Sequence, residues 1–532
     1  MRETKFMAAL SIVSFYFLSQ IQAWESALVH YSKEGKLQYS VDSEGNRIPD
    51  FSYAGYKRGE TELPDIPVVH TISPIDGDNT EHIQKAIDHV GAMPKDKHGF
   101  RGALLLTPGI YSTDNPVRIT YDGVIIRGSG RGDDPLVDTI IYSTRTQDDS
   151  AVIEVGIMSD RSVEWTDKVP NSRVVINDAL IPIGQRHFTV KDASQYKVGD
   201  HVVIVHIPKP AWFDAIDNGG TVKDPGWSVT YKDKMDISYS RFITDIKENQ
   251  ITVDAPFFYP LKSSHANSMM YKYDTTTASG KLYHQVGIED LRIDIETQSG
   301  EDEKHTQSAV NLSGVIDGWV KSCEFKHFKW AGVNVTKSLY VTVENCSSGP
   351  PVSKVRGGRR YNFCVSGGGQ LILFKNNTAM DCRHGFISNG GQSASGITVI
   401  KHNLIRNITG SEGHKLWTQG ILFDNCKVTS VINPDSRTYT FFNRGDYGTS
   451  HGWGTVNSVV WNTDTSAGGE IVVQKPPTAQ NYAIGCSGAV SGDSPFPGPA
   501  GFIEGTNEGE TLRPQSLYQA QLADRLEQPQ RP

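Results

Sequence analysis

Residue types suited to proton transfer and to binding negative charge recur through the second half of the chain. Residues 354–360 hold four Lys or Arg side chains in seven positions, and Tyr361 follows them directly. Three further groups come later, namely Arg383 with His384, His414 with Lys415, and Arg444 with His451. Histidine and tyrosine transfer protons, while arginine and lysine stabilise developing oxyanions. Together these types favour abstraction of a proton from a group that becomes negatively charged.

Removal of the C5 proton of a uronic acid is a reaction of this kind, because the proton becomes more acidic once the neighbouring carboxylate is neutralised. Either Tyr361 or His384 could act as the base. His414 and His451 could donate a proton to the oxygen that leaves C4. Candidates to bind the substrate, through its carboxylate, a sulfate or a ring face, are Arg360, Arg383, Lys415, Arg444, Trp417 and Trp453. The expected chemistry is β-elimination.

A short repeated strand predicts how these groups are positioned. It recurs around positions 322, 345, 376, 402, 425, 462 and 485, with steps of 23, 31, 26, 23, 37 and 23 residues. A base period near 23 that insertions only lengthen indicates one coil per repeat, with loops extending outward. The pattern predicts an all-β fold, a right-handed parallel β-helix. Because stacked coils place corresponding loops on one face, the basic loops are expected to converge in one groove; ordinary solvated loop charge is the alternative.

Small polar residues and cysteines occupy the repeat position. Strands of neighbouring coils lie about 4.8 Å apart, so polar side chains such as Asn345 can hydrogen-bond along the stack. Four of the six cysteines fall at this position: Cys323, Cys346, Cys426 and Cys486. Buried thiols are therefore expected rather than disulfides. His327 and His402 lie inside repeat strands and are interpreted as structural.

The chain divides into six segments by composition and pattern. Residues 1–23 have the layout of a cleaved signal peptide, with basic residues followed by an apolar run too short for a membrane span. The expected order after it is an N-terminal extension (24–72), the first coils with a capping helix at 81–90 (73–180), a small β insertion (181–256), the main coils (257–505) and a tail with a short helix (506–532).

Several motifs carry a resemblance to a known group of proteins. They include Asp78-Asn-Thr-Glu with the helix that follows, Leu105-Leu-Thr-Pro-Gly-Ile-Tyr111, Val124-Ile-Ile-Arg-Gly-Ser-Gly130 and His414-Lys-Leu-Trp-Thr-Gln-Gly-Ile421. The chain thereby resembles the pectate-lyase-like β-helix superfamily, and in particular secreted bacterial members found among degraders of uronate polysaccharides. The resemblance implies a carbon–oxygen lyase that leaves a 4,5-unsaturated uronate. The leaving group would be a sugar in a polysaccharide lyase, or water in an oligosaccharide dehydratase acting, for example, on ulvan fragments.

Charge and composition restrict partners and cofactors. The net charge of −8 argues against nucleic acid, while local basic loops still suit an anionic poly- or oligosaccharide. The densest acidic runs, Asp133-Asp134 and Glu301–Glu303, do not accompany the basic loops. The expected site therefore needs no metal or other cofactor, with Ca²⁺ as the alternative. We expect a secreted or periplasmic monomer without a membrane span.

Two other classes of protein compete with the lyase. A glycoside hydrolase needs two carboxyl groups across the scissile bond, and the available acids are Asp381, Glu412, Asp424 and Asp446. None of these forms a close Asp–Asp pair in the sequence. The third class is a non-catalytic glycan-binding protein, in which the basic loops would form only a binding face.

Overall fold

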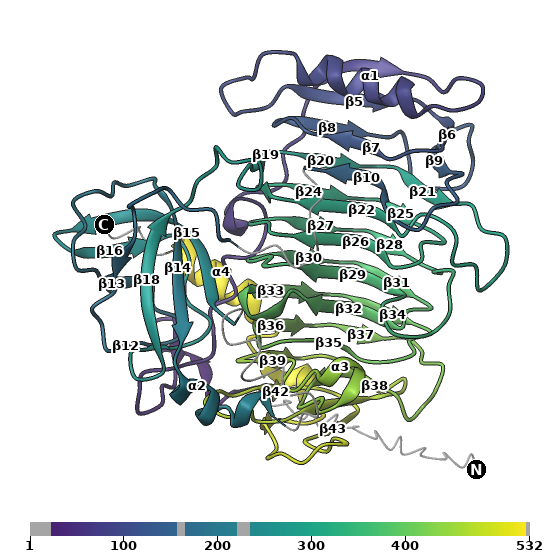
Figure 1. The fold of residues 1–532 in the computed structure, drawn as a ribbon. Coiled ribbons are helices and arrows are strands. Elements are labelled where there is room, and N and C mark those ends of the chain that lie inside the picture. Colours follow the sequence, from purple (N-terminus) through teal and green to yellow (C-terminus); the bar gives the residue numbers. More distant parts are fainter. Residues whose placement is uncertain (1–22, 157–164, 221–234, 528–532) are drawn as a thin grey trace, which may run out of the picture.

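The chain forms a parallel β-helix with an antiparallel domain beside it (Figure 1). The structure is a computed structural model that describes residues 23–156, 165–220 and 235–527. The expected signal segment, 1–23, lies almost wholly outside these residues. None of the helices in the described ranges is both long and apolar enough to cross a membrane.

Three long parallel sheets form the walls of the coil, and each coil contributes in turn to sheet 1, sheet 2 and sheet 3. Sheet 1 contains β4 (Val68–Ile72), β5 (Gly102–Leu106), β8 (Val124–Arg127), β20 (Gly287–Glu289), β24 (Trp319–Lys321), β27 (Thr342–Glu344), β30 (Leu373–Lys375), β33 (Ser395–Ile400), β36 (Thr418–Asp424), β40 (Val459–Trp461), β42 (Tyr482–Ile484) and β44 (Phe502–Glu504), with β39 (Thr455–Val456) paired to β36.

Sheet 2 contains β6 (Gly109–Thr113), β9 (Thr139–Ser143), β21 (Arg292–Ile295), β25 (Glu324–Phe325), β28 (Ser347–Ser348), β31 (Thr378–Met380), β34 (Asn403–Ile405) and β37 (Lys427–Val428). Sheet 3 contains β7 (Val117–Ile119), β10 (Ala151–Val155), β22 (Ser308–Ser313), β26 (Ala331–Thr336), β29 (Tyr361–Ser366), β32 (His384–Asn389), β35 (Ser411–Gly413), β38 (Arg437–Phe441), β41 (Glu470–Val473) and β43 (Ala489–Ser491).

The repeat position is the turn between sheets 1 and 2. Asn345, Asn376, Asn425 and Asn462 have φ between 46° and 55°, the left-handed conformation that asparagine tolerates better than other non-glycine residues. The register pairs Ile400 with Asp424, so Lys401 stacks with Asn425, and the repeat position of this coil is 401 rather than the expected 402. The asparagines thus recur chiefly because the turn requires this backbone conformation.

The residue after each turn points into the coil. Cys323, Cys346, Asn377, His402, Cys426, Thr463 and Cys486 are all buried. All six cysteines of the chain are free and buried, as expected for thiols that pack in a stack. Aromatic rings fill the middle of the coil: Phe374 lies 5.3 Å from Phe386, and Phe423 stacks on Phe441 at 5.5 Å between ring centroids.

Helix α1 (Thr80–Gly91) lies at the N-terminal end of the stack (Figure 1). Its buried residues Ile83, Ala86, Ile87 and Val90 belong to the same apolar core as the first strands. Sheet 1 already begins at β4, within the segment expected to be an extension, because Ile72 pairs with Leu106 of β5. The coil therefore starts a few residues earlier than position 73.

The antiparallel domain is larger than the expected 181–256 insertion. Its six-stranded sheet contains β11 (Val174–Val175), β18 (Ala266–Lys272), β14 (His201–Pro208), β15 (Ile237–Lys247), β16 (Gln250–Val253) and β13 (His187–Thr189). A second pair joins β12 (Leu180–Ile181) to β17 (Leu261–Lys262), and α2 (Pro210–Ala215) follows β14. Coil strands resume at β19 (Tyr283–His284) and β20, rather than at residue 257.

A fully buried arginine joins this domain to the coil. Arg241 of β15 donates hydrogen bonds to the carbonyl oxygens of Ser240, Ala255 and Pro256 and, at 2.8 Å, to the side-chain oxygen of Gln370. Gln370 in turn donates to the carbonyl oxygen of Ser238 at 2.8 Å. Because a guanidinium is costly to bury unless its donors are satisfied, these bonds fix the position of the domain against sheet 1.

Candidate active site

Seven polar side chains from successive coils meet at sheet 3, and we call them the sheet 3 cluster. They are Tyr361, Arg383, His384, Glu412, His414, Arg444 and His451. Tyr361 begins β29, His384 begins β32, and Tyr361 pairs with His384 in the register. Glu412 lies in β35, one coil further on, and pairs with Thr440 of β38.

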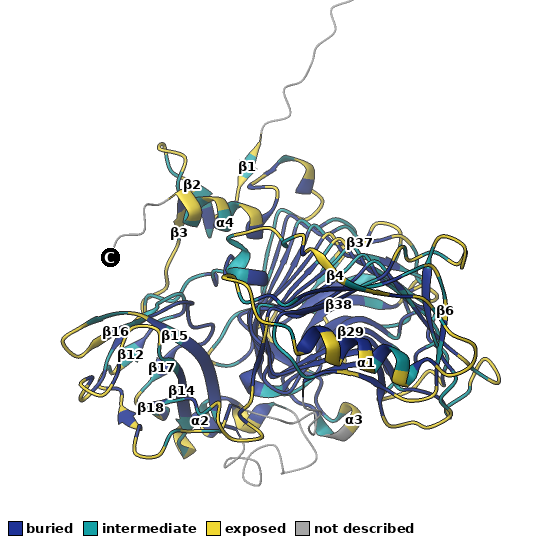
Figure 2. Cartoon of the chain, turned by 90° about the horizontal axis from the view of Figure 1, so that it is seen from above, coloured by how far each residue is buried: buried dark blue, intermediate teal, exposed yellow. Residues whose placement is uncertain are grey.

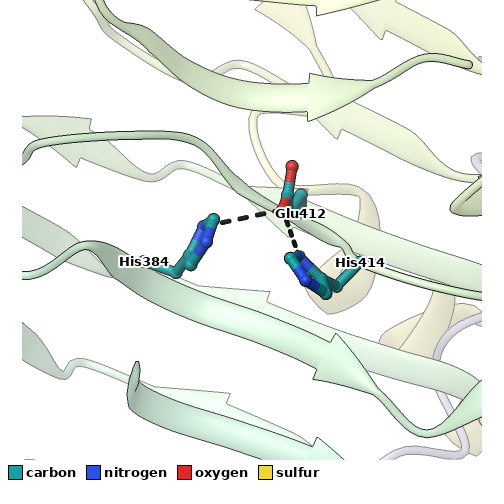
Figure 3. Close-up of side chains that lie close together, drawn as sticks. All are labelled: His384, Glu412 and His414. Atoms are coloured by element: carbon teal, nitrogen blue, oxygen red, sulfur yellow. Dashed lines mark hydrogen bonds and ion pairs between the residues drawn. The ribbon is translucent and has the colours of Figure 1, made fainter. Parts of the chain in front are cut away.

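Glu412 is the centre of the cluster (Figure 3). Its Oε1 lies 2.6 Å from Nδ1 of His414, 2.9 Å from Nη1 of Arg444 and 3.6 Å from Nδ1 of His384. Thr440 donates a hydrogen bond to Oε2 at 3.2 Å. The Glu412 side chain is about 5% exposed, so its charge is compensated by Arg444 rather than by water.

The alternation of a β-strand places Glu412 and His414 on one face. Gly413 lies between them and runs close to the next coil: a Cβ atom there would lie 2.5 Å from Cβ of Thr455. Arg444 also donates to the carbonyl oxygen of His414 at 2.9 Å. Backbone packing and side-chain bonding together hold these three residues in one arrangement.

Only one of the two ring nitrogens of His384 is hydrogen-bonded to a described group. Its Nδ1 is in hydrogen-bond contact with the carbonyl oxygen of Gly410. A carbonyl can only accept, so we assign the ring proton to Nδ1, which leaves Nε2 as an acceptor. No described side chain or backbone group hydrogen-bonds Nε2, although the atom is buried. Burial, the main cause, lowers the pKa of His384 well below its ordinary value, so the ring is neutral at pH 7.

His414 and His451 form a hydrogen-bonded pair. Their Nε2 atoms lie 3.1 Å apart, and their ring centroids 4.6 Å apart. Nδ1 of His414 contacts both Oε1 of Glu412 and Nη1 of Arg444. We assign the ring proton to Nδ1, facing the carboxylate, so that Nε2 accepts the proton of His451 Nε2. Burial, and then the charge of Arg444, lowers the pKa of both rings, to about 3 for His451. Both histidines are neutral at pH 7 in this arrangement.

Tyr361 closes the cluster on the N-terminal side. Its ring centroid lies 5.4 Å from that of His384, and its hydroxyl accepts a hydrogen bond from the backbone N–H of Gly358 at 3.1 Å. Nη1 of Arg383 lies 3.5 Å from the same oxygen. Burial raises the pKa of the Tyr361 phenol, and the charge of Arg383 opposes part of that rise. The phenol therefore holds its proton at pH 7.

The structure brings together the four residues expected to be catalytic and two of the expected substrate ligands, Arg383 and Arg444. Lys415 lies close enough for its charge to lower the pKa of His414 and His451. Arg360 is directed elsewhere, because Nε and Nη2 both donate to the carbonyl oxygen of Ser353, at 3.0 and 2.7 Å.

The two tryptophans expected to contact substrate are buried instead. Trp417 packs edge-on against Trp212 of α2 at 5.6 Å and against Tyr259 at 6.0 Å, in the core between the coil and the antiparallel domain. Trp453 belongs to the same core, and only 3% of its surface is exposed to solvent. Indole surface is worth most when it is removed from water, and here the inserted domain covers it.

Glu412 is the functional residue that the sequence reasoning placed in another role. The sequence offered it only as an acid for a hydrolase. A usable signal was its spacing: Glu412-Gly-His414 puts a carboxylate and an imidazole on the same face of a strand. Two of the other acids have partners outside the cluster: Asp381 pairs with Arg406 at 2.6 Å, and Asp424 accepts from Ser516 and from the backbone of Tyr518. The third, Asp446, directly precedes α3 (Tyr447–Ser450) in the segment between Arg444 and His451.

The cluster contains a set of atoms that could bind a metal ion. One ligand atom each from His384, Glu412 and His414 lie within 4.8 Å of one another. However, Arg444 contacts both Oε1 of Glu412 and Nδ1 of His414, so its guanidinium already occupies the position next to these two ligands. A divalent ion would have to displace that cation. Independence from metal therefore stays a prediction.

The fold and the cluster together define a parallel β-helix protein with a largely buried cluster of ionisable side chains on one sheet. No family model and no curated protein matches the chain. Among solved structures, it is similar to the tailspike protein gp49 of Pseudomonas phage LKA1 (12% identity, 80% of this chain, 74% of that chain, TM-score 0.39). It is also similar to PfbA, a surface adhesin of Streptococcus pneumoniae (9% identity, 81% and 88% covered, TM-score 0.33), and to an iota-carrageenase (10% identity, 69% and 58% covered, TM-score 0.31). With TM-scores below 0.5, these similarities carry no argument about function.

Proposed function

We propose that the sheet 3 cluster catalyses β-elimination on uronic-acid-containing poly- or oligosaccharides. The observation that carries this proposal is the set of groups around His384. Its ring is neutral, no described group hydrogen-bonds its Nε2, and it lies beside the protonated phenol of Tyr361 and the guanidinium of Arg383. β-Elimination needs a base, an acid and a cation that binds the substrate's carboxylate. The cluster contains all three.

Nε2 of His384 takes the C5 proton, and the electrons of the C5–H bond form the C4=C5 double bond as the C4–O bond breaks. The departing oxygen takes a proton from the Tyr361 hydroxyl, whose raised pKa keeps it protonated until that step. Water returns His384 and Tyr361 to their starting states. The product is a 4,5-unsaturated uronate.

Arg383 is the proposed ligand of the substrate's carboxylate. Arg444 is already paired with Glu412, whereas Arg383 is only partly buried and its Nη1 lies 3.5 Å from the hydroxyl oxygen of Tyr361. A bidentate guanidinium neutralises the carboxylate and stabilises the charge that develops when C5 loses its proton. Glu412 is proposed as a positioning residue: it holds Arg444 and His414 in place and does not itself contact the substrate.

A glycoside hydrolase receives less support from the same geometry. Hydrolysis needs two carboxyl groups about 5 to 9.5 Å apart on either side of the scissile bond. Glu412 is compensated by Arg444, while Asp381 and Asp424 have partners outside the cluster. Asp446 precedes α3, between Arg444 and His451 in the chain, and is not one of the seven residues of the cluster. Within the described residues, the cluster holds one carboxylate. We therefore propose a lyase, acting outside the cytoplasm as a monomer and without a cofactor.

The test is a product assay on the mature protein. Uronic-acid oligosaccharides derived from ulvan, alginate and pectin should gain ultraviolet-absorbing unsaturated ends, with or without EDTA. Mass spectrometry then separates the two leaving groups: loss of water from an intact oligosaccharide identifies a dehydratase, and shortened chains identify a polysaccharide lyase. New reducing ends without absorbance would establish a hydrolase. Tight binding without any product would leave a non-catalytic glycan-binding protein.

A further inference from the structure

A cavity of about 460 Å³ lies on sheet 2, apart from the sheet 3 cluster. It is lined by Ile110, Ser112, Asp133, Ile140, Tyr142, Arg292 and Asp294. Six of these residues come from the adjacent strands β6, β9 and β21. The volume is in the range of sites that bind small molecules. The cluster begins several coils further along the chain, on another sheet.

Two of the polar side chains of this cavity, Arg292 and Asp294, are already held by other groups of the protein. Nη2 of Arg292 donates to Oδ2 of Asp294 at 2.7 Å, and Nδ1 of His327 lies 2.7 Å from Oδ1 of the same carboxylate. Hydrogen bonds from His327 and Arg292 outweigh burial and hold the pKa of Asp294 below its ordinary value. Side chains that are already immobilised lose little conformational entropy on binding.

Apolar surface lies directly beside these charges. Ile110 is 48% exposed, and the ring of Tyr142 is partly exposed on the next strand. A sugar ring has the matching character, with C–H groups on its faces and hydroxyls on its edge. The lining holds two carboxylates, Asp133 and Asp294, against one guanidinium. This balance favours an uncharged, hydroxyl-rich unit over a polyanion.

A row of hydrogen-bonding side chains continues from the cavity along sheet 2. The strand register aligns Arg292, Glu324, Ser347, Thr378, Asn403 and Lys427, and none of them is fully buried. Adjacent strands lie about 4.8 Å apart. A linear polymer that runs along the stack would therefore meet one polar side chain on every strand.

We propose that the outer face of sheet 2, beginning at this cavity, binds an uncharged segment of a polysaccharide chain. The site retains polymer and performs no chemistry. It acts whether or not the sheet 3 cluster is a lyase, because it rests on the cavity and the polar row alone.

The experiment uses affinity gel electrophoresis of the full-length mature protein in gels cast with xylan, ulvan or pectin. The test variants Tyr142→Ala and Tyr142→Phe are made in a His384→Ala background, so that turnover does not change the matrix. The matched control is Tyr31→Ala, which removes a comparably exposed tyrosine from the β2–β3 hairpin (Val29–Tyr31, Leu37–Tyr39). Circular dichroism and thermal unfolding verify that each variant is folded.

We expect retardation by at least one polysaccharide, about tenfold weaker binding for Tyr142→Ala, and near wild-type binding for Tyr142→Phe and Tyr31→Ala. The proposal is overturned if no polysaccharide retards the protein, or if Tyr142→Ala binds like the control. Equal losses in Tyr142→Ala and Tyr31→Ala would also overturn it. Failure of the lyase proposal is seen separately, as the absence of unsaturated product from protein with His384 intact.

Discussion

At the scale of single residues, charge balance decides what the sheet 3 cluster can do. Glu412 and Arg444 compensate each other, and the buried histidines are neutral. Arg383 and Lys415 are then the cations left to attract an anionic substrate. The same burial that keeps His384 neutral makes it a usable base at pH 7, because a protonated imidazole cannot accept a proton.

Replacing His384 with Gln or Ala should lower the rate of unsaturated-product formation by about 10²-fold or more. Gln should change the thermal unfolding midpoint less than Ala, which leaves a cavity and an unpaired Gly410 carbonyl. Gln keeps a polar group near Gly410 but cannot act as a base. The matched control is His187→Ala, which removes an exposed histidine of the antiparallel domain. A His384→Gln protein with wild-type kcat would contradict the assigned role.

The buried histidines should make the free energy of unfolding depend on pH. His402 is fully buried, neither of its ring nitrogens hydrogen-bonds a described group, and burial lowers its pKa to about 3. The unfolded chain takes up this proton below about pH 6.5. The free energy of unfolding should therefore fall as the pH is lowered from about 6.5 towards 3, and His384, His414 and His451 add to the effect in the same direction.

His402→Leu should reduce that acid sensitivity and should not destabilise the protein at pH 7. Replacing an unsatisfied polar ring with an apolar side chain of similar size is nearly neutral or stabilising. Urea unfolding at pH 7 and pH 4.5 measures the effect, with His187→Ala as the control. A variant that loses as much stability on acidification as the wild type would show that His402 is not a major contributor.

The contents of the cluster were partly predictable from sequence, because His, Arg and Tyr in Gly-rich loops are chemically conspicuous. Arg360 and Arg383 look equivalent in the sequence, yet hydrogen bonding to Ser353 directs Arg360 away. The sequence shows Glu412 as a possible acid but does not show that it pairs with Arg444, because Arg444 lies a full coil further along the chain. Such contacts depend on loop paths that no local pattern encodes.

At the scale of elements, the repeat was predictable because backbone conformation dictates it. Asparagine recurs where φ is positive, and the residue that follows it packs inward. The tryptophans were misassigned for the opposite reason: an indole in a Gly-rich loop has the same local sequence whether it faces sugar or another domain. The surface that covers Trp417 comes from Trp212 and Tyr259, more than 150 residues away in the chain.

The turn conformation gives a prediction for Asn345, where φ is 55°. Asn345→Val should lower the free energy of unfolding by about 1–2 kcal/mol, because a β-branched side chain is strained in the left-handed region. Asn345→Gly serves as the matched control and should change stability by only a few tenths of a kcal/mol. Chemical denaturation measures both; equal effects of the two substitutions would mean that the asparagine side chain, rather than the backbone, matters here.

At the scale of the whole molecule, the two ends of the described chain hold each other. Figure 2 shows α4 (Leu517–Glu527) beside β2 and β3. Strand β1 (Trp24–Glu25) pairs with β45 (Leu512–Arg513), and the side chain of Gln521 binds the backbone of both Pro49 and Phe51. The ends are thus tied through contacts more than 400 residues apart in sequence, which a local sequence pattern does not reveal.

Arg525 makes several of the contacts between these ends. Its guanidinium donates to the carbonyl oxygens of Ser52 and Arg58, pairs with Glu60 at 2.8 Å and lies 4.3 Å from the ring centroid of Tyr53. Arg525→Ala should lower the free energy of unfolding by about 2–3 kcal/mol, because partly buried carbonyls lose a charged donor.

The matched control is Lys36→Ala, which removes the ion pairs that the residue before β3 makes with Asp524 and Glu527 and should cost no more than about 1 kcal/mol. Differential scanning calorimetry, together with limited proteolysis of the N-terminal segment, measures both variants. Since Arg525 lies far from sheet 3, the kcat of folded Arg525→Ala should remain near that of wild type at low temperature. If the two variants unfold alike, the contacts of Arg525 contribute no more than an exposed pair, and the ends are held chiefly by the apolar packing of Leu517 and Tyr518.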